Sequence, residues 1–291
     1  MTTMITEPRF PARGARLARA GVLAAAIAVT AAADGRADDG FRPAIAVTPE
    51  GITCVLGGNL NGELVDATVV TPLMTHKQDY ALVTLAGIKD VALSIGRPKE
   101  DDVDGGCEGR FNQELSIGPA QTGDYMVAVL GSKDEVLALL PGDIEILPTD
   151  SPEPAAILRD YLEDGGIADP KLVVTQIIRA DLDGDGDKDL LINAASTARD
   201  TTRKDEYSVV LVRKKTRTGV QTLEISADIV TEDIDEPSPL WENTVAGIVD
   251  IDGDGVMEIV LYGAYAFGDG WQVVRVRDGE VEPALFCGCG G

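Results

Sequence analysis

The sequence is poor in histidine, aromatic residues and positive charge. Its 291 residues include one histidine, 4% aromatics, and 25 basic against 49 acidic residues. The net charge of −24 makes nucleic acid and anionic membranes poor partners. His76 lies in a polar stretch typical of a surface loop. Ser-His-Asp and Cys-His catalysis would both need this histidine, so we expect a protein that is not an enzyme.

Other signatures of catalysis are missing as well. The sequence contains no Gly-x-Ser-x-Gly elbow, no Walker loop and no dinucleotide-binding fingerprint. Carboxylates are abundant, so a glycosidase-type pair of acids stays open as an alternative, although no particular pair stands out.

Long hydrophobic segments are also absent. The Ala-rich run from Gly21 to Ala33 is shorter than the about 20 residues that span a bilayer, and arginines precede it at positions 13, 16 and 19. This order of parts predicts a signal peptide over residues 1–37, cleaved after Ala37 or Ala33. The alternative is a buried Ala-rich helix. We therefore expect a secreted or periplasmic protein with no transmembrane segment.

Cysteine is scarce but suited to an oxidising compartment. The candidates for disulfide bonds are Cys54, Cys107, Cys287 and Cys289. We favour the pairs Cys54–Cys107 and Cys287–Cys289, although four cysteines allow three connectivities. The Cys-Gly-Cys pair would close a small, strained ring, so a redox-labile pair is an alternative. A zinc site is disfavoured because no histidine lies nearby.

What the sequence does contain is a succession of short β-type segments. Seven such runs between positions 41 and 148 predict an antiparallel β-sandwich. Residues 149–171 are expected to form a linker with one short helix, over about 154–164, whose apolar stripe packs on a sheet. Residues 172–291 form the remaining β region, which gives an all-β fold.

An internal repeat organises this last region. Residues 174–195 align with residues 243–264 at a constant offset of 69. Each copy reads as a strand, an acidic loop and a second strand, and a third strand follows. We therefore predict a duplicated blade or β-meander.

Each copy carries the residues of a metal-binding loop. Carboxylates occupy positions 1, 3, 5 and 9, a glycine occupies position 6, and a backbone carbonyl is available at position 7. The predicted ligands are Asp181, Asp183, Asp185, the Asp187 carbonyl and Asp189 in the first loop, and Asp250, Asp252, Asp254, the Val256 carbonyl and Glu258 in the second. Oxygen ligands on a curved backbone suit Ca²⁺ better than Mg²⁺ or Zn²⁺.

These loops differ from EF-hands, which need a bidentate glutamate at position 12 and helices on both sides. Position 12 is Ile192 in the first loop and Leu261 in the second, and the flanking residues are typical of strands. Two Ca²⁺ sites at strand turns are therefore expected. Calcium is expected to stabilise the fold, the alternative being a regulatory ion.

The segments DLDGDGDKD from Asp181 and DIDGDGVME from Asp250 resemble the calcium loops of FG-GAP and VCBS repeats. The resemblance covers roughly residues 172–280 and implies two β-propeller-like blades, each with calcium between adjacent strands.

The function expected from these features is that of an exported calcium-binding repeat protein, acting as a binding or interaction module for an extracellular protein or glycan. Tyr262, Tyr265, Phe267 and Trp271 cluster in the second repeat, where either core packing or a binding face would explain them. The alternative function is a calcium-dependent hydrolase, or hydrolase accessory, acting on an extracellular polymer. The oligomeric state is left open.

Overall fold

The structure is a computed structural model that describes residues 40–101, 109–118, 122–197, 202–216, 219–233, 240–265 and 267–289. The chain divides into two units, Met1–Asp34 and Gly35–Gly291, and the described residues all belong to the second. The predicted signal peptide, with Ala33 and Ala37, lies outside the described residues, as does Cys107. Among the described residues, no helix is long and apolar enough to cross a membrane.

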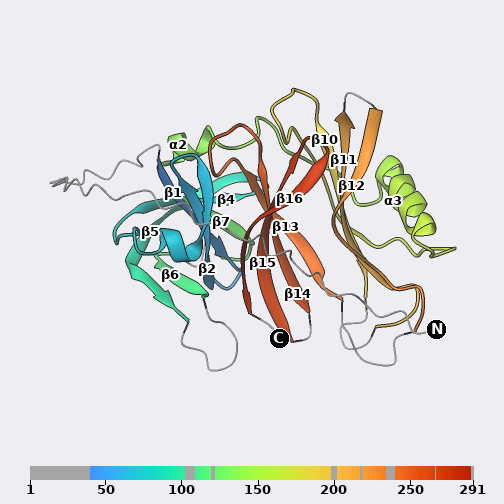
Figure 1. Cartoon of the computed structure of the whole chain (residues 1–291), viewed down its shortest axis with the longest axis horizontal. Coiled ribbons are helices and arrows are strands. Elements are labelled where there is room, and N and C mark those ends of the chain that lie inside the picture. Colours follow the sequence, from blue (N-terminus) through green and yellow to red (C-terminus); the bar gives the residue numbers. More distant parts are fainter. Residues whose placement is uncertain are drawn as a thin grey trace, which may run out of the picture. The chain divides into compact units, whose positions relative to one another are not determined.

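The described residues form three antiparallel sheets, and most of their strands are labelled in Figure 1. The prediction of an all-β fold is confirmed. The first sheet has the strand order β3-β2-β1-β7-β4-β5-β6. Its strands are β1 (Phe41–Val47), β2 (Thr53–Leu60), β3 (Glu63–Asp66), β4 (Asp79–Thr84), β5 (Gly87–Glu100), β6 (Phe111–Leu115) and β7 (Met126–Leu130).

The first sheet curls into a half-barrel, because β2 comes back into contact with β6. Side chains that alternate along β1 explain how both faces are covered. Ile45 and Val47 belong to the core enclosed by the first sheet, together with Tyr80 and Met126. Ala44 and Ala46 point to the opposite face and enter a different core. The finer description as a β-sandwich stays a prediction.

The second and third sheets are meanders that contain the two sequence repeats. The second has the order β12-β11-β10-β9-β8 and the third β13-β14-β15-β16. The strands are β8 (Glu145–Ile146), β9 (Val174–Ala180), β10 (Asp189–Ser196), β11 (Tyr207–Thr216), β12 (Gly219–Ile229), β13 (Glu242–Val249), β14 (Glu258–Tyr265), β15 (Gly268–Arg277) and β16 (Glu280–Cys289). Thus β9–β12 correspond to β13–β16, one strand more per copy than the sequence predicts. The propeller-like blade and the domain boundaries stay predictions.

The third sheet shares cores with both of its neighbours. On β14, Val260 belongs to the core that includes Ala44 and Ala46 of β1. The adjacent residues Ile259 and Leu261 belong instead to a core shared with the second sheet. This alternation shows why Ile259, Val260 and Leu261 are all apolar: this part of β14 is buried on both faces and has no solvent-facing position.

Helix α3 (Pro152–Asp164) is the helix expected from the sequence. Its buried residues Leu158 and Leu162 pack against Ile177, Ile192 and Leu211 of the second sheet, as predicted for its apolar stripe. Figure 1 shows α3 beside the labels of β11 and β12. The Pro-rich start suits a helix N-terminus, where proline costs no hydrogen bond.

The structure adds two short helices where the sequence predicts strands, α1 (Ala67–Val70) and α2 (Lys133–Leu137). The expectation of a single helix is therefore wrong. Asp66 caps α1 by accepting hydrogen bonds from backbone N–H groups in its first turn. Ser132 and Glu135 form a reciprocal capping box at the start of α2. Caps of this kind favour helix locally even where apolar residues suggest a strand.

The favoured disulfide pairing is also wrong. Cys54 of β2 is bonded to Cys287 of β16, with a Cα–Cα distance of 6.3 Å across 233 residues of sequence. Both cysteines lie in the core shared by the first and third sheets. The packing of β16 against β2 brings them together, and no local spacing in the sequence reveals it. This bond ties the first strands of the unit to the last.

Candidate metal centre

The two acidic loops join the first and second strands of each repeat. Residues 181–188 connect β9 to β10, and residues 250–257 connect β13 to β14. Ala180 pairs with Asp189, and Val249 pairs with Glu258. The carboxylate at position 9 of each loop is therefore also the first residue of the returning strand, as the sequence predicts for a strand-turn site.

The first residue of each loop organises the turn. Asp181 accepts hydrogen bonds from the backbone N–H groups of Gly184 at 2.8 Å and Gly186 at 2.9 Å. Asp250 accepts the equivalent bonds from Gly253 at 2.7 Å and Gly255 at 2.9 Å. These turns curve the backbone around the carboxylates. Each loop glycine has a positive φ, which glycine adopts without strain.

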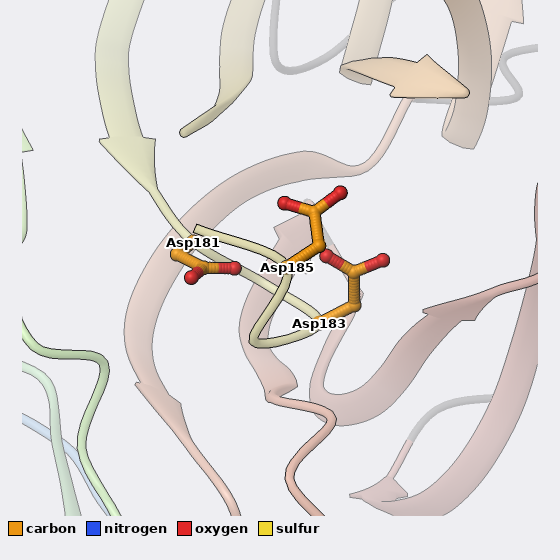
Figure 2. A group of neighbouring side chains, drawn as sticks. All are labelled: Asp181, Asp183 and Asp185. Carbon is orange, nitrogen blue, oxygen red and sulfur yellow. The ribbon is translucent and has the colours of Figure 1, made fainter. Parts of the chain in front are cut away.

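The structure brings the carboxylates at positions 1, 3 and 5 together in both loops. Candidate ligand atoms of Asp181, Asp183 and Asp185 lie within 4.8 Å of one another, and so do those of the equivalent residues of the second loop, Asp250, Asp252 and Asp254. Figure 2 shows the three side chains of the first loop extending from one tight turn. A cation would relieve the repulsion between carboxylates held this close.

In the first loop, a lysine reaches the position 9 carboxylate. Lys214 of β11 donates to Asp189 at 3.0 Å and contacts Asp183 at 2.7 Å. Its side chain is 5% exposed and that of Asp189 is 3% exposed. Burial acts to lower the pKa of Lys214, but its hydrogen bonds to Asp183 and Asp189 outweigh burial and raise it, so the ammonium stays charged. Burial, as the largest cause, raises the pKa of Asp189.

A second lysine binds the outer part of this loop. Lys215 donates to the side chain of Asp187 at 2.7 Å, on the solvent-exposed side. The sequence predicts the backbone carbonyls of Asp187 and, in the second loop, of Val256 as metal ligands, and these two ligands stay predictions. Exposed pairs of this kind contribute little to stability.

The second loop has a different position 9. Glu258 is fully buried, and its Oε2 accepts a hydrogen bond from the N–H of Ile251 at 2.7 Å. Its Oε1 has no hydrogen-bond partner among the described residues. Burial, the largest cause, raises the pKa of Glu258 to about 8, and the charges of Asp252 and Asp250 add to the rise. An unpartnered carboxylate oxygen in such a place needs a proton or a cation.

Arginines of β15 approach the same loop from its edge. Arg275 contacts Asp252 at 3.2 Å and Glu282 of β16 at 3.0 Å, and Arg277 contacts Asp254. Burial, as the largest cause, raises the pKa of Asp252, and the charge of Asp254 adds to the rise while that of Arg275 opposes it. The loop motif gives no sign of Lys214, Lys215, Arg275 and Arg277. They come from strands next to the loops, so the motif itself does not contain them.

The second loop contacts both of its neighbours. The N–H of Met257 donates to the carbonyl of Leu182 in the first loop at 2.8 Å. From the first sheet, Asn59 donates to the carbonyl of Asp252 at 3.1 Å and Arg42 to that of Ile251 at 3.3 Å. The second acidic loop therefore lies between the first loop and strands β1 and β2.

His76 is exposed, as expected for a surface residue. Of the aromatic cluster, Trp271 is buried in the core, where Tyr262 and Tyr125 contact its ring, whereas Phe267 is exposed.

Comparison of the chain with family models, curated proteins and solved structures gives no match.

Proposed function

We propose that this chain is an exported, non-enzymatic calcium-binding protein in which Ca²⁺ stabilises the acidic strand-turn loops. The observation that carries the proposal is the fully buried Glu258, which lies near the charges of Asp250 and Asp252 and whose Oε1 has no hydrogen-bond partner among the described residues. A divalent cation would supply the missing interaction and relieve the crowding of negative charge at the same time.

The donor set favours calcium over other metals. The side chains gathered in the second loop, Asp250, Asp252 and Asp254, offer only oxygen. Ca²⁺ accepts six to eight oxygens in variable geometry, whereas Zn²⁺ prefers nitrogen or sulfur and Mg²⁺ a strict octahedron. Backbone carbonyls and water would complete the shell. The resemblance to FG-GAP and VCBS loops supports the same metal.

Calcium would act here on the fold. The second loop is bonded to Asn59 and Arg42 of the first sheet and to Leu182 of the first loop. An ion that fixes this loop therefore strengthens contacts on both sides of it. Binding energy that depends on the folded loop adds directly to the free energy of unfolding.

The function built on this fold is proposed to be binding of an extracellular protein or glycan. The support is two solvent-exposed aromatic side chains, Phe267 just before β15 and Phe286 within β16, which are 71% and 66% exposed. Aromatic side chains at the surface are characteristic of binding faces. The disulfide between Cys54 and Cys287 supports an oxidising compartment, and therefore export.

The test is titration of the full chain with Ca²⁺ by calorimetry, with thermal unfolding in Ca²⁺ and in EDTA. A site bound at a hundredfold excess over its Kd adds about 2.7 kcal/mol to the free energy of unfolding, so Tm should rise in Ca²⁺. The Asp250→Asn variant should lose the part of this rise that comes from the second loop. The matched control is Glu163→Gln, an exposed acid of α3. Absence of binding heat together with an unchanged Tm would refute the proposal.

A further inference from the structure

We infer that the two acidic loops are not equivalent: Lys214 takes the place of the metal ion in the first loop, and the chain binds one Ca²⁺, in the second. This inference rests on the proposed function and sharpens it. The sequence predicts one Ca²⁺ in each loop. We infer instead that the second loop binds Ca²⁺ and that the charge of the first loop is neutralised by Lys214.

The two loops have basic residues at the same place in their repeats. On β11, Lys214 follows Arg213, and Arg213 pairs with Leu190 of β10. On β15, Arg275 pairs directly with Glu258 of β14. The offset of 69 residues places Leu190 and Ile259 at equivalent positions, and Ile259 pairs with Val274. Lys214 and Arg275 are therefore equivalent side chains, each next to the position 9 carboxylate of its loop.

What differs is the residue across from each base on the last strand. Lys214 pairs with Gln221 of β12, whereas Arg275 pairs with Glu282 of β16. The neutral Gln221 offers Lys214 no opposite charge, and Lys214 turns to Asp183 and Asp189. Glu282 accepts a hydrogen bond from the Nε of Arg275 at 3.0 Å and draws the guanidinium to the edge of the second loop. The bases of the two repeats therefore have different partners: Lys214 contacts the position 9 carboxylate, whereas Arg275 contacts the acid across from it on the last strand.

The consequence in the first loop is a site already occupied by a cation. The ammonium of Lys214 neutralises the carboxylates of Asp183 and Asp189, at positions 3 and 9 of the loop. The lysine side chain is only 5% exposed to solvent. Ca²⁺ could enter only by displacing this ammonium from two hydrogen bonds. An unpaired ammonium left buried there would be costly, because the cost of removing a charge from water is no longer offset.

In the part of the chain that the structure describes, no basic side chain forms an ion pair with Glu258, the position 9 carboxylate of the second loop. One of its oxygens has no hydrogen-bond partner there, although the side chain is fully buried. The side chains of Arg275 and Arg277 are 23% and 36% exposed, so they can move toward solvent and toward Glu282 without leaving a buried charge. A metal ion in this loop would therefore gain the buried carboxylate of Glu258 as a ligand. It would displace only Arg275 and Arg277, which solvent can reach.

The experiment is calcium titration of the full chain and of loop variants by isothermal calorimetry. The wild type should bind one ion per chain. Asp250→Asn should abolish binding, whereas Asp181→Asn should leave the stoichiometry at one. Two ions per wild-type chain, or loss of binding in Asp181→Asn with retention in Asp250→Asn, would overturn the inference while preserving the proposed function. Binding of no ion by the wild type would refute both.

A second pair of variants tests the role of Lys214 directly. Lys214→Gln should raise the stoichiometry from one ion to two, because the first loop loses its internal cation. The matched control is Lys215→Gln, which removes the same charge from the exposed neighbour bound to Asp187 and should stay at one. A second ion in Lys215→Gln would show that net charge alone decides, and would overturn the inference. If Lys214→Gln fails to fold without calcium, its circular dichroism in excess Ca²⁺ should recover the wild-type spectrum; failure to recover counts against the inference.

Discussion

Glu258 shows how a single residue can couple the fold to its solution conditions. The side chain is fully buried, and its ionised form loses hydration that one hydrogen bond from Ile251 does not replace. A proton and a metal ion are two ways of meeting this cost. The stability of the second loop should therefore respond to pH when metal is absent, and less so when metal is bound.

We predict that in EDTA the free energy of unfolding falls as pH rises between about 4.5 and about 8, the ordinary and the folded pKa of Glu258. In this range the folded state binds more protons than the unfolded state, so a rise in pH favours unfolding. Thermal unfolding between pH 5 and pH 9 measures the slope.

The Glu258→Gln variant serves as the control, because its amide cannot ionise. The fall in Tm should be smaller in this variant than in the wild type. Equal slopes in the two proteins would show that Glu258 is not the group responsible. Saturating Ca²⁺ should reduce the slope of the wild type, since the ion stabilises the ionised carboxylate.

The sequence predicts that the carboxylates at positions 1, 3 and 5 of each loop gather, but it does not predict the basic side chains beside them. Asp181, Asp183 and Asp185 gather as expected because spacing along one loop decides their positions. Lys214 reaches this loop through the pairing of β10 with β11, strands separated by residues 197–206. A long connection leaves the register open, and a shift of one residue would move Lys214 to the other face of the sheet.

Among the elements, helix α3 is the one whose packing the sequence foresees. Its apolar residues recur at helical spacing, and Leu158 and Leu162 are both fully buried against the second sheet. The two short helices illustrate the opposite case. In α2, Val136 and Leu137 read as part of a strand, yet the capping box between Ser132 and Glu135 decides the local structure.

We predict that Leu158→Ala lowers the free energy of unfolding by about 2 to 5 kcal/mol, the usual cost of removing a buried leucine side chain. Chemical denaturation followed by circular dichroism measures the loss. Arg159→Ala is the matched control, since this neighbour is exposed on the same helix and should change stability by less than about 0.5 kcal/mol. Equal effects of the two substitutions would mean that α3 does not depend on its packing against the sheet.

For the molecule as a whole, the third sheet and the disulfide hold the described unit together. The third sheet shares one core with the first sheet and another with the second. The all-β class follows from the strand-like patterns, but the order of the sheets does not, because it depends on contacts between segments far apart in sequence. The same limitation explains the wrong pairing of Cys54, whose partner lies 233 residues away.

We predict that Cys54→Ser and Cys287→Ser each lower the free energy of unfolding by about 2 to 5 kcal/mol, as expected for loss of a native disulfide. The free energy of unfolding of the double variant should be no lower than that of the less stable single variant, because both substitutions remove the same bond. Denaturation curves of the three variants measure this. Additive losses would show that the two cysteines act independently of each other.

The bond between Cys54 and Cys287 also sets an order of events during synthesis. A chain that emerges from its N-terminal end presents Cys54 first, then Cys107, and Cys287 only after the last strand has begun to appear. The native partner, Cys287, is thus synthesised after Cys107. Until Cys287 is synthesised, the thiol of Cys107 can compete for Cys54. Maturation in an oxidising compartment should accordingly depend on thiol–disulfide exchange and on an isomerase, more than on the speed of oxidation.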